Sequence, residues 1–236
     1  MLRVNNIYPA FMGEVNQFGI GVPCTFVRLA GCNLRCYFAT KGTLCDTPEA
    51  LDEKAGEIMG EETILSKCKE HGHRVICLTG GEPLLQDVTS FLVTASKMGF
   101  YVVIETNGSR SIKPYTTIPN VSFIVDRKSH SSGELSKMLE ENYSLMKNTD
   151  FLKFVIDTED DYNEALTFYR SKKGFNYNIA LGTFWGSKVS YQWLMNKMHE
   201  DKFDAYLNMQ THKMACLYDE INRNAGVKFI KIPRSL

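Results

Sequence analysis

Short runs rich in β-branched and aromatic residues recur along this chain, and stretches with helical periodicity separate them. Strands that alternate with helices form right-handed βαβ units and a mostly parallel sheet. The sequence therefore predicts an α/β fold. The strands are expected at residues 24–29, 74–78, 101–105, 121–125, 151–156, 178–181, 205–207 and 227–230.

The segments between the expected strands carry apolar residues on one helical face. The i, i+3, i+4 spacing of a buried face holds for Val88, Phe91, Leu92, Ala95 and Met98. Gly99 is placed to end that helix, and Thr158 followed by Asp161 predicts the start of another. No linker or repeat divides the chain, so we expect a single domain over residues 1–236. Because a closed eight-stranded barrel usually needs about 250 residues, we expect an open, partial TIM-like barrel with mostly parallel strands.

The composition limits the class of protein and the kind of partner. Hydrophobic residues make up 44% and charged residues 23% of the chain, which is typical of a globular protein and excludes a disordered one. Basic and acidic residues each number 27, so no net field would draw the chain to nucleic acid or an anionic membrane. The beginning of the sequence lacks the apolar run of a signal peptide, and no stretch approaches the roughly 18 apolar residues of a membrane span. We expect a cytoplasmic protein with a small-molecule partner.

Three of the seven cysteines, Cys32, Cys36 and Cys45, fall within one loop after the strand at 24–29. An odd number of cysteines in a reducing compartment argues against disulfides. Three thiolates can each bind one iron of a 4Fe-4S cluster and leave the fourth iron open for a ligand that is not protein. The remaining cysteines are interpreted as core residues: Cys24, Cys68, Cys77 and Cys216.

A structural zinc site is the alternative for the cysteine loop. Such a site needs a fourth cysteine or histidine, normally at close spacing. The nearby sequence supplies none. The candidate histidines lie far from the cysteine loop in sequence: His71, His73, His130 and His212. Zinc therefore requires a ligand from elsewhere in the fold.

Gly-rich and polar loops follow four consecutive expected strands, at residues 31–47, 79–83, 106–109 and 126–132. Ligands of parallel α/β sheets bind where strands end and loops begin. The sequence therefore predicts one mouth lined by these four loops.

Three motifs in order resemble the radical S-adenosylmethionine superfamily: the cysteine loop, Leu78-Thr79-Gly80-Gly81-Glu82-Pro83, and Ile104-Glu105-Thr106-Asn107-Gly108. The resemblance implies a 4Fe-4S cluster whose open iron chelates S-adenosylmethionine. Glycines at 80 and 81 would let backbone approach that cofactor closely, and Glu82 with Pro83 would fix the turn into the helix. The cofactor-binding residues implied by the resemblance are Thr79, Gly80, Gly81, Glu82, Glu105, Asn107, Asp126 and Lys128.

The resemblance narrows to the 7-carboxy-7-deazaguanine synthases through four stretches, at residues 12–14, 26–32, 45–47 and 208–213. It implies that Thr47 falls where that family binds magnesium. The substrate-binding residues that follow are Phe11, Met12, Gly13, Glu14, Arg28 and Thr79, with Trp185 and His212 as further candidates. A structural salt bridge is the alternative for Glu14, a surface ion pair for Arg28, and a core or dimer position for His212.

Several positions depart from the synthase pattern. The usual C-x3-C-x2-C has become C-x3-C-x8-C, with Ala39 where the third cysteine is expected. Asp126-Arg127-Lys128 replaces Ser-Pro-Lys, and an aspartate there could hold ribose hydroxyls. Gly182-Thr183 replaces a Gln-Pro pair. These changes surround the expected substrate and cofactor sites, so they favour changed chemistry on a related substrate.

The preferred prediction is a radical S-adenosylmethionine lyase of the queuosine pathway, which resembles the queuine lyases that release 7-aminomethyl-7-deazaguanine by C–N cleavage. The first alternative is 7-carboxy-7-deazaguanine synthase, which contracts the ring of 6-carboxytetrahydropterin. The alternative from another class is a non-catalytic zinc or tRNA-binding module, against which the zero net charge weighs. The resemblance also implies a homodimer and an electron donor such as flavodoxin or ferredoxin. No general acid or base stands out, and the candidates are Lys128, Lys153 and His212.

Overall fold

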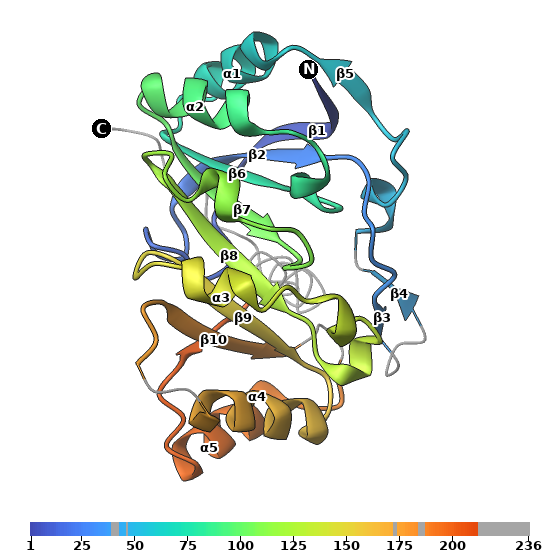
Figure 1. Ribbon diagram of the computed structural model, residues 1–236, viewed down its shortest axis with the longest axis vertical. Helices are drawn as coiled ribbons and strands as arrows, with labels where there is room; N and C mark the ends of the chain where they lie inside the picture. Colours follow the sequence, from blue (N-terminus) through green and yellow to red (C-terminus); the bar gives the residue numbers. More distant parts are fainter. Residues whose placement is uncertain (39–42, 46, 172–173, 184–186, 212–236) are drawn as a thin grey trace, which may run out of the picture.

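The computed structural model describes residues 1–38, 43–45, 47–171, 174–183 and 187–211 (Figure 1). One nine-stranded sheet in this part of the chain has the order β11-β10-β9-β8-β7-β6-β2-β1-β5. Its strands are β1 (Leu2–Phe11), β2 (Pro23–Leu29), β5 (Glu57–Met59), β6 (Val75–Gly80), β7 (Tyr101–Thr106), β8 (Val121–Arg127), β9 (Phe151–Ile156), β10 (Asn178–Thr183) and β11 (Tyr206–Leu207).

The seven strands β2, β6, β7, β8, β9, β10 and β11 are parallel to one another, and β1 and β5 add an antiparallel edge next to β2. The two ends of the sheet are not hydrogen-bonded to each other, which confirms the predicted open, mostly parallel α/β architecture. Seven of the eight expected strands form, and the eighth, at 227–230, lies outside the described residues. The small hairpin of β3 (Tyr37–Phe38) and β4 (Thr43–Leu44) projects from the cysteine loop.

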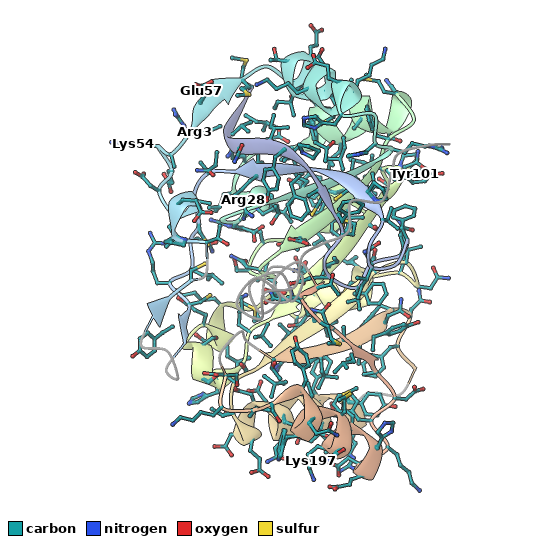
Figure 2. All side chains as sticks on the ribbon, turned by 180° about the vertical axis from the view of Figure 1, so that it is seen from behind. Arg3, Arg28, Lys54, Glu57, Tyr101 and Lys197 are labelled. Carbon is teal, nitrogen blue, oxygen red and sulfur yellow. The ribbon has the colours of Figure 1, made fainter. Side chains whose placement is uncertain are left out.

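β1 was not predicted from the sequence. Its residues include Asn5, Asn6 and Pro9, which are poor strand formers, and only Leu2 and Val4 are deeply buried. Pairing with β2 stabilises it, and the register shifts between Val4 and Asn6. Charged side chains protect the adjoining edge of the sheet, where Figure 2 shows Arg3, Lys54 and Glu57 close together.

Helices cover one face of the sheet: α1 (Glu61–Glu70), α2 (Thr89–Lys97), α3 (Glu141–Leu145), α4 (Glu159–Ser171) and α5 (Tyr191–Glu200). α1 and α2 lie by β1 and β7, whereas α4 and α5 lie by β9 and β10 (Figure 1). The predicted helix at 88–98 is confirmed, and Gly99 ends it with a φ of 83°. None of the described helices is both long and apolar enough to cross a bilayer.

Alternate residues of each parallel strand face the helices or the opposite, concave side. The helix-facing residues form the main core, as in Ile76 and Leu78 of β6 and Leu152 and Phe154 of β9. The concave face begins apolar and ends polar along the strand direction. A second cluster fills its amino-terminal half, made of Met12, Cys24, Val75, Cys77, Val103 and Ile124.

The segment after β1 crosses the concave face and reaches the far end of the sheet. Val15 packs there against Phe151 and Ala180, and its backbone N–H donates to Asn208 Oδ1 at 2.9 Å. The backbone N–H of Thr211 donates to the carbonyl of Gly13 at 3.1 Å. The open sheet is therefore bridged by its own amino-terminal segment, which encloses the concave side.

Candidate active site

A cavity opens at the carboxyl ends of the parallel strands, on the concave face. The sequence predicted that loops of four strands would meet here, and the structure adds β9, β10 and the segment after β11. The cavity is lined by Gly13, Glu14, Phe26, Arg28, Cys45, Thr47, Thr79, Gly80, Gly81, Glu105, Thr106, Asn107, Asp126, Lys128, Lys153, Val155, Gly182, Thr183, Asn208 and Gln210.

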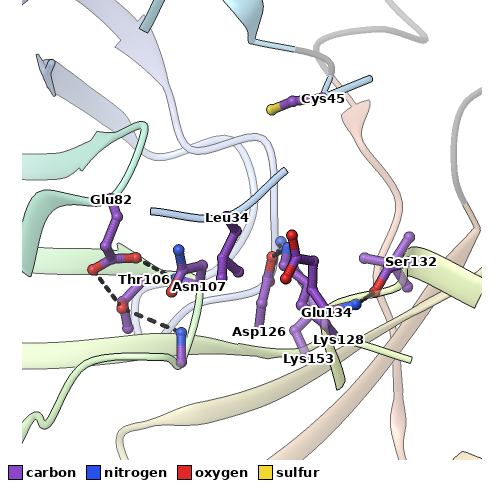
Figure 3. Close-up of polar contacts among 12 residues, drawn as sticks. Leu34, Cys45, Glu82, Thr106, Asn107, Asp126, Lys128, Ser132, Glu134 and Lys153 are labelled. Atoms are coloured by element: carbon purple, nitrogen blue, oxygen red, sulfur yellow. Dashed lines mark hydrogen bonds and ion pairs between the residues drawn. The ribbon is translucent and has the colours of Figure 1, made fainter. Parts of the chain in front are cut away.

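Four charged side chains form a continuous chain of ion pairs in the cavity wall, and we call them the cavity ion network. Lys153 Nζ lies 2.5 Å from Glu14 Oε2 and 3.0 Å from Asp126 Oδ1. Lys128 Nζ lies 2.5 Å from Asp126 Oδ2 (Figure 3). Gln210 Nε2 donates to Glu14 Oε1 at 2.9 Å, which completes the set of acceptors on that carboxylate. The network joins the segment after β1 to β8 and β9.

All four groups are charged at neutral pH. Burial alone would raise the pKa of Asp126, but Lys128 and Lys153 outweigh it and lower the pKa to about 2. Burial likewise opposes ionisation of Glu14, yet Lys153 holds the pKa of Glu14 below its usual value. Desolvation would lower the pKa of both lysines, and the surrounding carboxylates raise it instead. Lys128 and Lys153 are therefore fixed cations, which argues against the prediction that either acts as a base.

Glu105 of β7 and Arg28 of β2 face the same cavity from strands on either side of β6. Burial first, and then the charge of Glu14, raise the pKa of Glu105 above its ordinary value. Arg28 Nη2 donates to Tyr8 Oη at 3.2 Å. Glu105 also helps to raise the pKa of Arg28 against the effect of burial. Glu105 is thus the cavity carboxylate with a raised pKa, and it is better suited than either lysine to exchange a proton.

Glu82 lies behind the cavity wall and is completely buried. Its carboxylate accepts hydrogen bonds from Leu84 N, Thr106 Oγ1 and Asn107 N at 3.0, 2.8 and 2.6 Å (Figure 3). This confirms that Glu82 fixes the turn after β6. It also corrects the prediction that Glu82 binds the cofactor, because its acceptor atoms are directed at protein donors and it does not line the cavity.

Gly80 and Gly81 stand where β6 meets the cysteine loop. A Cβ at Gly80 would lie 2.4 Å from the carbonyl oxygen of Leu29, and one at Gly81 would lie 2.2 Å from that of Gly31. No side chain fits at either position without moving backbone. Close backbone approach was predicted here toward a cofactor, and the structure shows that the protein's own chain already requires it.

The cysteine loop is fastened to the loops after β7 and β8. Asn107 Nδ2 lies 3.7 Å from Cys32 Sγ, Thr47 N donates to Cys45 Sγ at 3.4 Å, and Arg35 N donates to Glu134 Oε1 at 2.6 Å. Burial raises the pKa of Cys36 to about 11, and the charges of Cys32 and Cys45 act on it in the same direction. N–H groups directed at Cys32 and Cys45 suit sulfurs that act as thiolate ligands.

The described residues do not contain three cysteine, histidine or acidic side chains already gathered as a metal site. The donor set and its place beside the cavity nevertheless fit an iron–sulfur cluster. Cys24, Cys68 and Cys77 are fully buried, which confirms them as core residues, and Cys216 lies outside the described residues.

Two of the predicted substrate residues do not reach the cavity. Phe11 is 63% exposed at the end of β1, and Met12 is fully buried in the second apolar cluster. The structure corrects both predictions, because the Phe11 side chain faces solvent and the Met12 side chain packs in the apolar core, so neither lines the cavity. Trp185 and His212 lie outside the described residues. Gly13, Glu14, Arg28 and Thr79 all line the cavity (Figure 2 labels Arg28).

Some lining residues were not named as site residues from the sequence, although all of them except Val155 fall within the motifs or departures described above. They are Phe26, Thr106, Val155, Gly182, Thr183, Asn208 and Gln210. Strand alternation could have indicated two of them, because Phe26 precedes Arg28 by two residues and Val155 follows Lys153 by two. Asn208 and Gln210 belong to the 208–213 stretch that resembles the synthases, but their contacts with Val15 and Glu14 depend on the crossing of the amino-terminal segment, which no local pattern predicts.

The sheet is open and mostly parallel. A three-cysteine loop follows its first parallel strand, β2, and a Gly-Gly turn follows the next, β6. This combination defines a radical S-adenosylmethionine enzyme. No family model matches the sequence. The chain is 34% identical over 230 residues to a 7-carboxy-7-deazaguanine synthase of Koribacter versatilis, covering 90% of this chain and 96% of the relative. A second synthase, from Methanospirillum hungatei, is 32% identical and is covered to 84%. The chain belongs to the 7-carboxy-7-deazaguanine synthase family.

The fold has a solved counterpart. A crystal structure of QueE from Escherichia coli superposes with a TM-score of 0.68 over 88% of this chain and 93% of that one, at 19% identity. This likeness supports the open radical-enzyme fold. The relatives carry the synthase name, so the comparisons favour the synthase over the lyase that was preferred from the sequence.

Proposed function

We propose that the protein is a 7-carboxy-7-deazaguanine synthase, which contracts the ring of 6-carboxytetrahydropterin. This proposal rests on the match of the chain to a named synthase over nearly its full length. A charged cavity beside the cysteine loop supports it. Glu14, Arg28 and Thr79 line that cavity and supply the hydrogen-bonding groups that a flat, guanine-like ring requires.

Cys32, Cys36 and Cys45 would hold the 4Fe-4S cluster, and S-adenosylmethionine would bind next to it. When bound, this pair supplies a reducing electron and an organic radical that abstracts hydrogen from the substrate. Thr79, Gly80, Gly81 and Asn107 line the cavity on the cluster side and would border the cofactor. Thr47 lines the cavity beside Cys45, so the predicted magnesium ion would bind at the same end.

The protein's own groups orient the reactants and hold protons. Lys128 and Lys153 remain ammonium donors, and the paired carboxylates prevent them from repelling each other. Glu105, whose pKa is raised by burial, would carry the exchangeable proton of the cavity. The surrounding strands exclude water from most of this wall, which strengthens each electrostatic contact.

Queuine lyase is the second candidate, because the departures from the synthase pattern line the cavity itself. Asp126, Gly182 and Thr183 border it, and so does the displaced Cys45. Asp126 also pairs with both cavity lysines, so each of these cations already has a carboxylate partner where the synthase substrate would bring its own carboxylate. Altered residues at the reacting end of a cavity change specificity more readily than altered residues elsewhere.

The test is turnover by anaerobically reconstituted protein with dithionite and S-adenosylmethionine. Separate incubations receive 6-carboxytetrahydropterin or queuine, and mass spectrometry measures 5′-deoxyadenosine and the deazapurine products. Formation of 7-carboxy-7-deazaguanine from the pterin supports the synthase. Product from queuine alone rejects it in favour of the lyase. The Cys45→Ala variant is the control, and it should lack both a full cluster and turnover.

The predicted homodimer and electron donor also belong to this proposal. Sedimentation of the purified protein measures the first. Replacement of dithionite by a flavodoxin or ferredoxin reducing system measures the second, through the same 5′-deoxyadenosine readout.

A further inference from the structure

Asp126 occupies the centre of the cavity ion network, and each of its carboxylate oxygens already pairs with a lysine. Oδ1 lies 3.0 Å from the ammonium of Lys153, and Oδ2 lies 2.5 Å from that of Lys128. The sequence-based expectation that this carboxylate holds ribose hydroxyls therefore competes with two charge-assisted bonds that are already made. A ribose hydroxyl could donate only to the lone pairs that the two ammonium groups leave on this carboxylate.

The two lysines belong to different ends of the cavity. Lys128 lies two residues beyond Asp126, in the loop after β8 whose residues 130–132 contact β3 of the cysteine loop, so it lies at the cluster end. Lys153 pairs with Glu14, whose other oxygen accepts from Gln210, so it lies at the end formed by the amino-terminal segment and the segment after β11. Asp126 is the described residue that contacts both.

We propose that Asp126 is a positioning residue, which fixes Lys128 at the cofactor end and Lys153 at the substrate end in one rigid frame. The inference rests on the proposed function only for the identity of the substrate. Without the carboxylate, Lys128 would lose its ion-pair partner, Lys153 would keep only its pair with Glu14, and the two ammonium groups would repel each other. The distance between cofactor and substrate would then be held less tightly, and the radical would be formed without reaching its target.

The neighbouring residue on β8 offers a matched control. Arg127 points to the helix side of the strand and pairs with Glu164 of α4 at 2.5 Å. Glu164→Gln removes the carboxylate partner of Arg127, the residue next to Asp126 on β8. This ion pair is also half-buried, but it lies outside the cavity. Asp126→Asn and Asp126→Ser remove the negative charge, and Asp126→Glu keeps it at a different reach.

The main readout is the ratio of 5′-deoxyadenosine to deazapurine product, with whichever substrate the wild type converts. In Asp126→Asn and Asp126→Ser we expect this ratio and the substrate KM to rise about tenfold to a hundredfold. Asp126→Glu should recover part of the coupling, and Glu164→Gln should leave the ratio unchanged. The affinity for S-adenosylmethionine, measured by equilibrium dialysis, should fall much less than tenfold if Asp126 makes no bond to the ribose.

A double variant separates positioning from folding. Asp126→Asn with Lys128→Met restores the charge balance of the network, so its thermal unfolding should return toward that of the wild type while the ratio stays high. Recovery of coupling together with stability would overturn the proposal, because a purely structural role would then suffice. A large loss of cofactor affinity with an unchanged ratio would overturn it in favour of ribose binding.

Failure of the proposed function gives a different pattern. If neither the pterin nor queuine is converted, the substrate assignment fails. Asp126 can still be tested through uncoupled 5′-deoxyadenosine formation, which should then be equal in the wild type and Asp126→Asn. A slower reaction in Asp126→Asn alone would contradict positioning between two ligands.

Discussion

Glu82 shows at the scale of one residue how burial and hydrogen bonding oppose each other. Desolvation raises the pKa of its carboxyl group to about 7, although hydrogen bonds from Asn107, Leu84 and Thr106 lower it in part. The motif predicted the turn at this position, but not that its acid would be sealed from the cavity.

Glu82 therefore makes stability depend on pH. Its folded pKa lies above the unfolded value of 4.5, so folding binds a proton between pH 4.5 and 7, and stability falls as pH rises through that window. From pH 5 to pH 8 the advantage of the wild type over Glu82→Gln should shrink by up to about 3 kcal/mol. Urea unfolding at both values measures it. A difference between the two proteins that does not vary with pH would contradict the assignment.

Gly81 is a second residue whose surroundings determine the effect of a substitution on stability. A Cβ there would lie 2.2 Å from the carbonyl oxygen of Gly31 and 2.6 Å from that of Ala50, which are backbone atoms of the cysteine loop. Gly81→Ala should destabilise the protein by more than about 2 kcal/mol and lower the iron bound on reconstitution. Gly60→Ala is the matched control, because its nearest atom lies at 3.8 Å. Equal unfolding of both variants would refute the close approach.

Helix α4 illustrates the scale of the element, where sequence prediction succeeds because the signals are local. Thr158 Oγ1 accepts from Asp161 N at 3.2 Å, and Asp161 Oδ2 accepts from Thr158 N at 3.0 Å. This reciprocal pair satisfies two donors at the start of the helix. Both residues lie within one turn, so the spacing alone was sufficient to predict it.

The two members of this pair should differ in their effects on stability. Thr158→Ala should cost about 1 kcal/mol, as should Ser190→Ala at the start of α5, where Ser190 Oγ accepts from Trp193 N. Asp161→Ala should cost more, because its carboxylate also accepts from Ser131 Oγ at 2.7 Å and from Asp157 N at 3.1 Å. Chemical denaturation measures all three. Equal losses would show that the bonds beyond the helix contribute nothing.

The parallel strands, like α4, were predictable because their signals are local. β1 and the long-range contacts of the site were not. Runs such as 151–156 are apolar enough to identify a buried strand, and Lys153 within that run already indicated a special position. Its partners could not be predicted, because Glu14 lies 139 residues away. Phe11 and Met12 were placed wrongly because the sequence did not reveal β1, and so did not reveal which way its last residues point.

At the scale of the whole molecule, Lys153 ties distant parts of the chain together. It is buried between Glu14 and Asp126, whereas Lys197 contacts Glu200 and Asp201 at the surface of α5 (Figure 2). Two lysines with the same number of carboxylate partners thus differ mainly in their exposure to water. Burial should therefore decide how much each lysine contributes to the free energy of unfolding.

Lys153→Met should lower the free energy of unfolding by about 3–5 kcal/mol, because it leaves two buried carboxylates without a shared cation. Lys197→Met should leave it nearly unchanged, because water screens an exposed pair. Calorimetry of the two variants compares them directly. Similar values would show that the buried network relaxes and admits water when the lysine is removed.

The bridge across the open sheet has a consequence for how the protein is made. Gly13 and Val15 emerge from the ribosome early, but their partners Thr211 and Asn208 follow nearly 200 residues later. The strands between them can pair in order during translation. The cavity wall that includes Gly13 is completed only when Asn208 and Thr211 have been synthesised. A nascent chain halted before Asn208 would hold a paired sheet with an incomplete cavity wall, so the capacity to bind substrate would arise only after the segment that follows β11 has emerged.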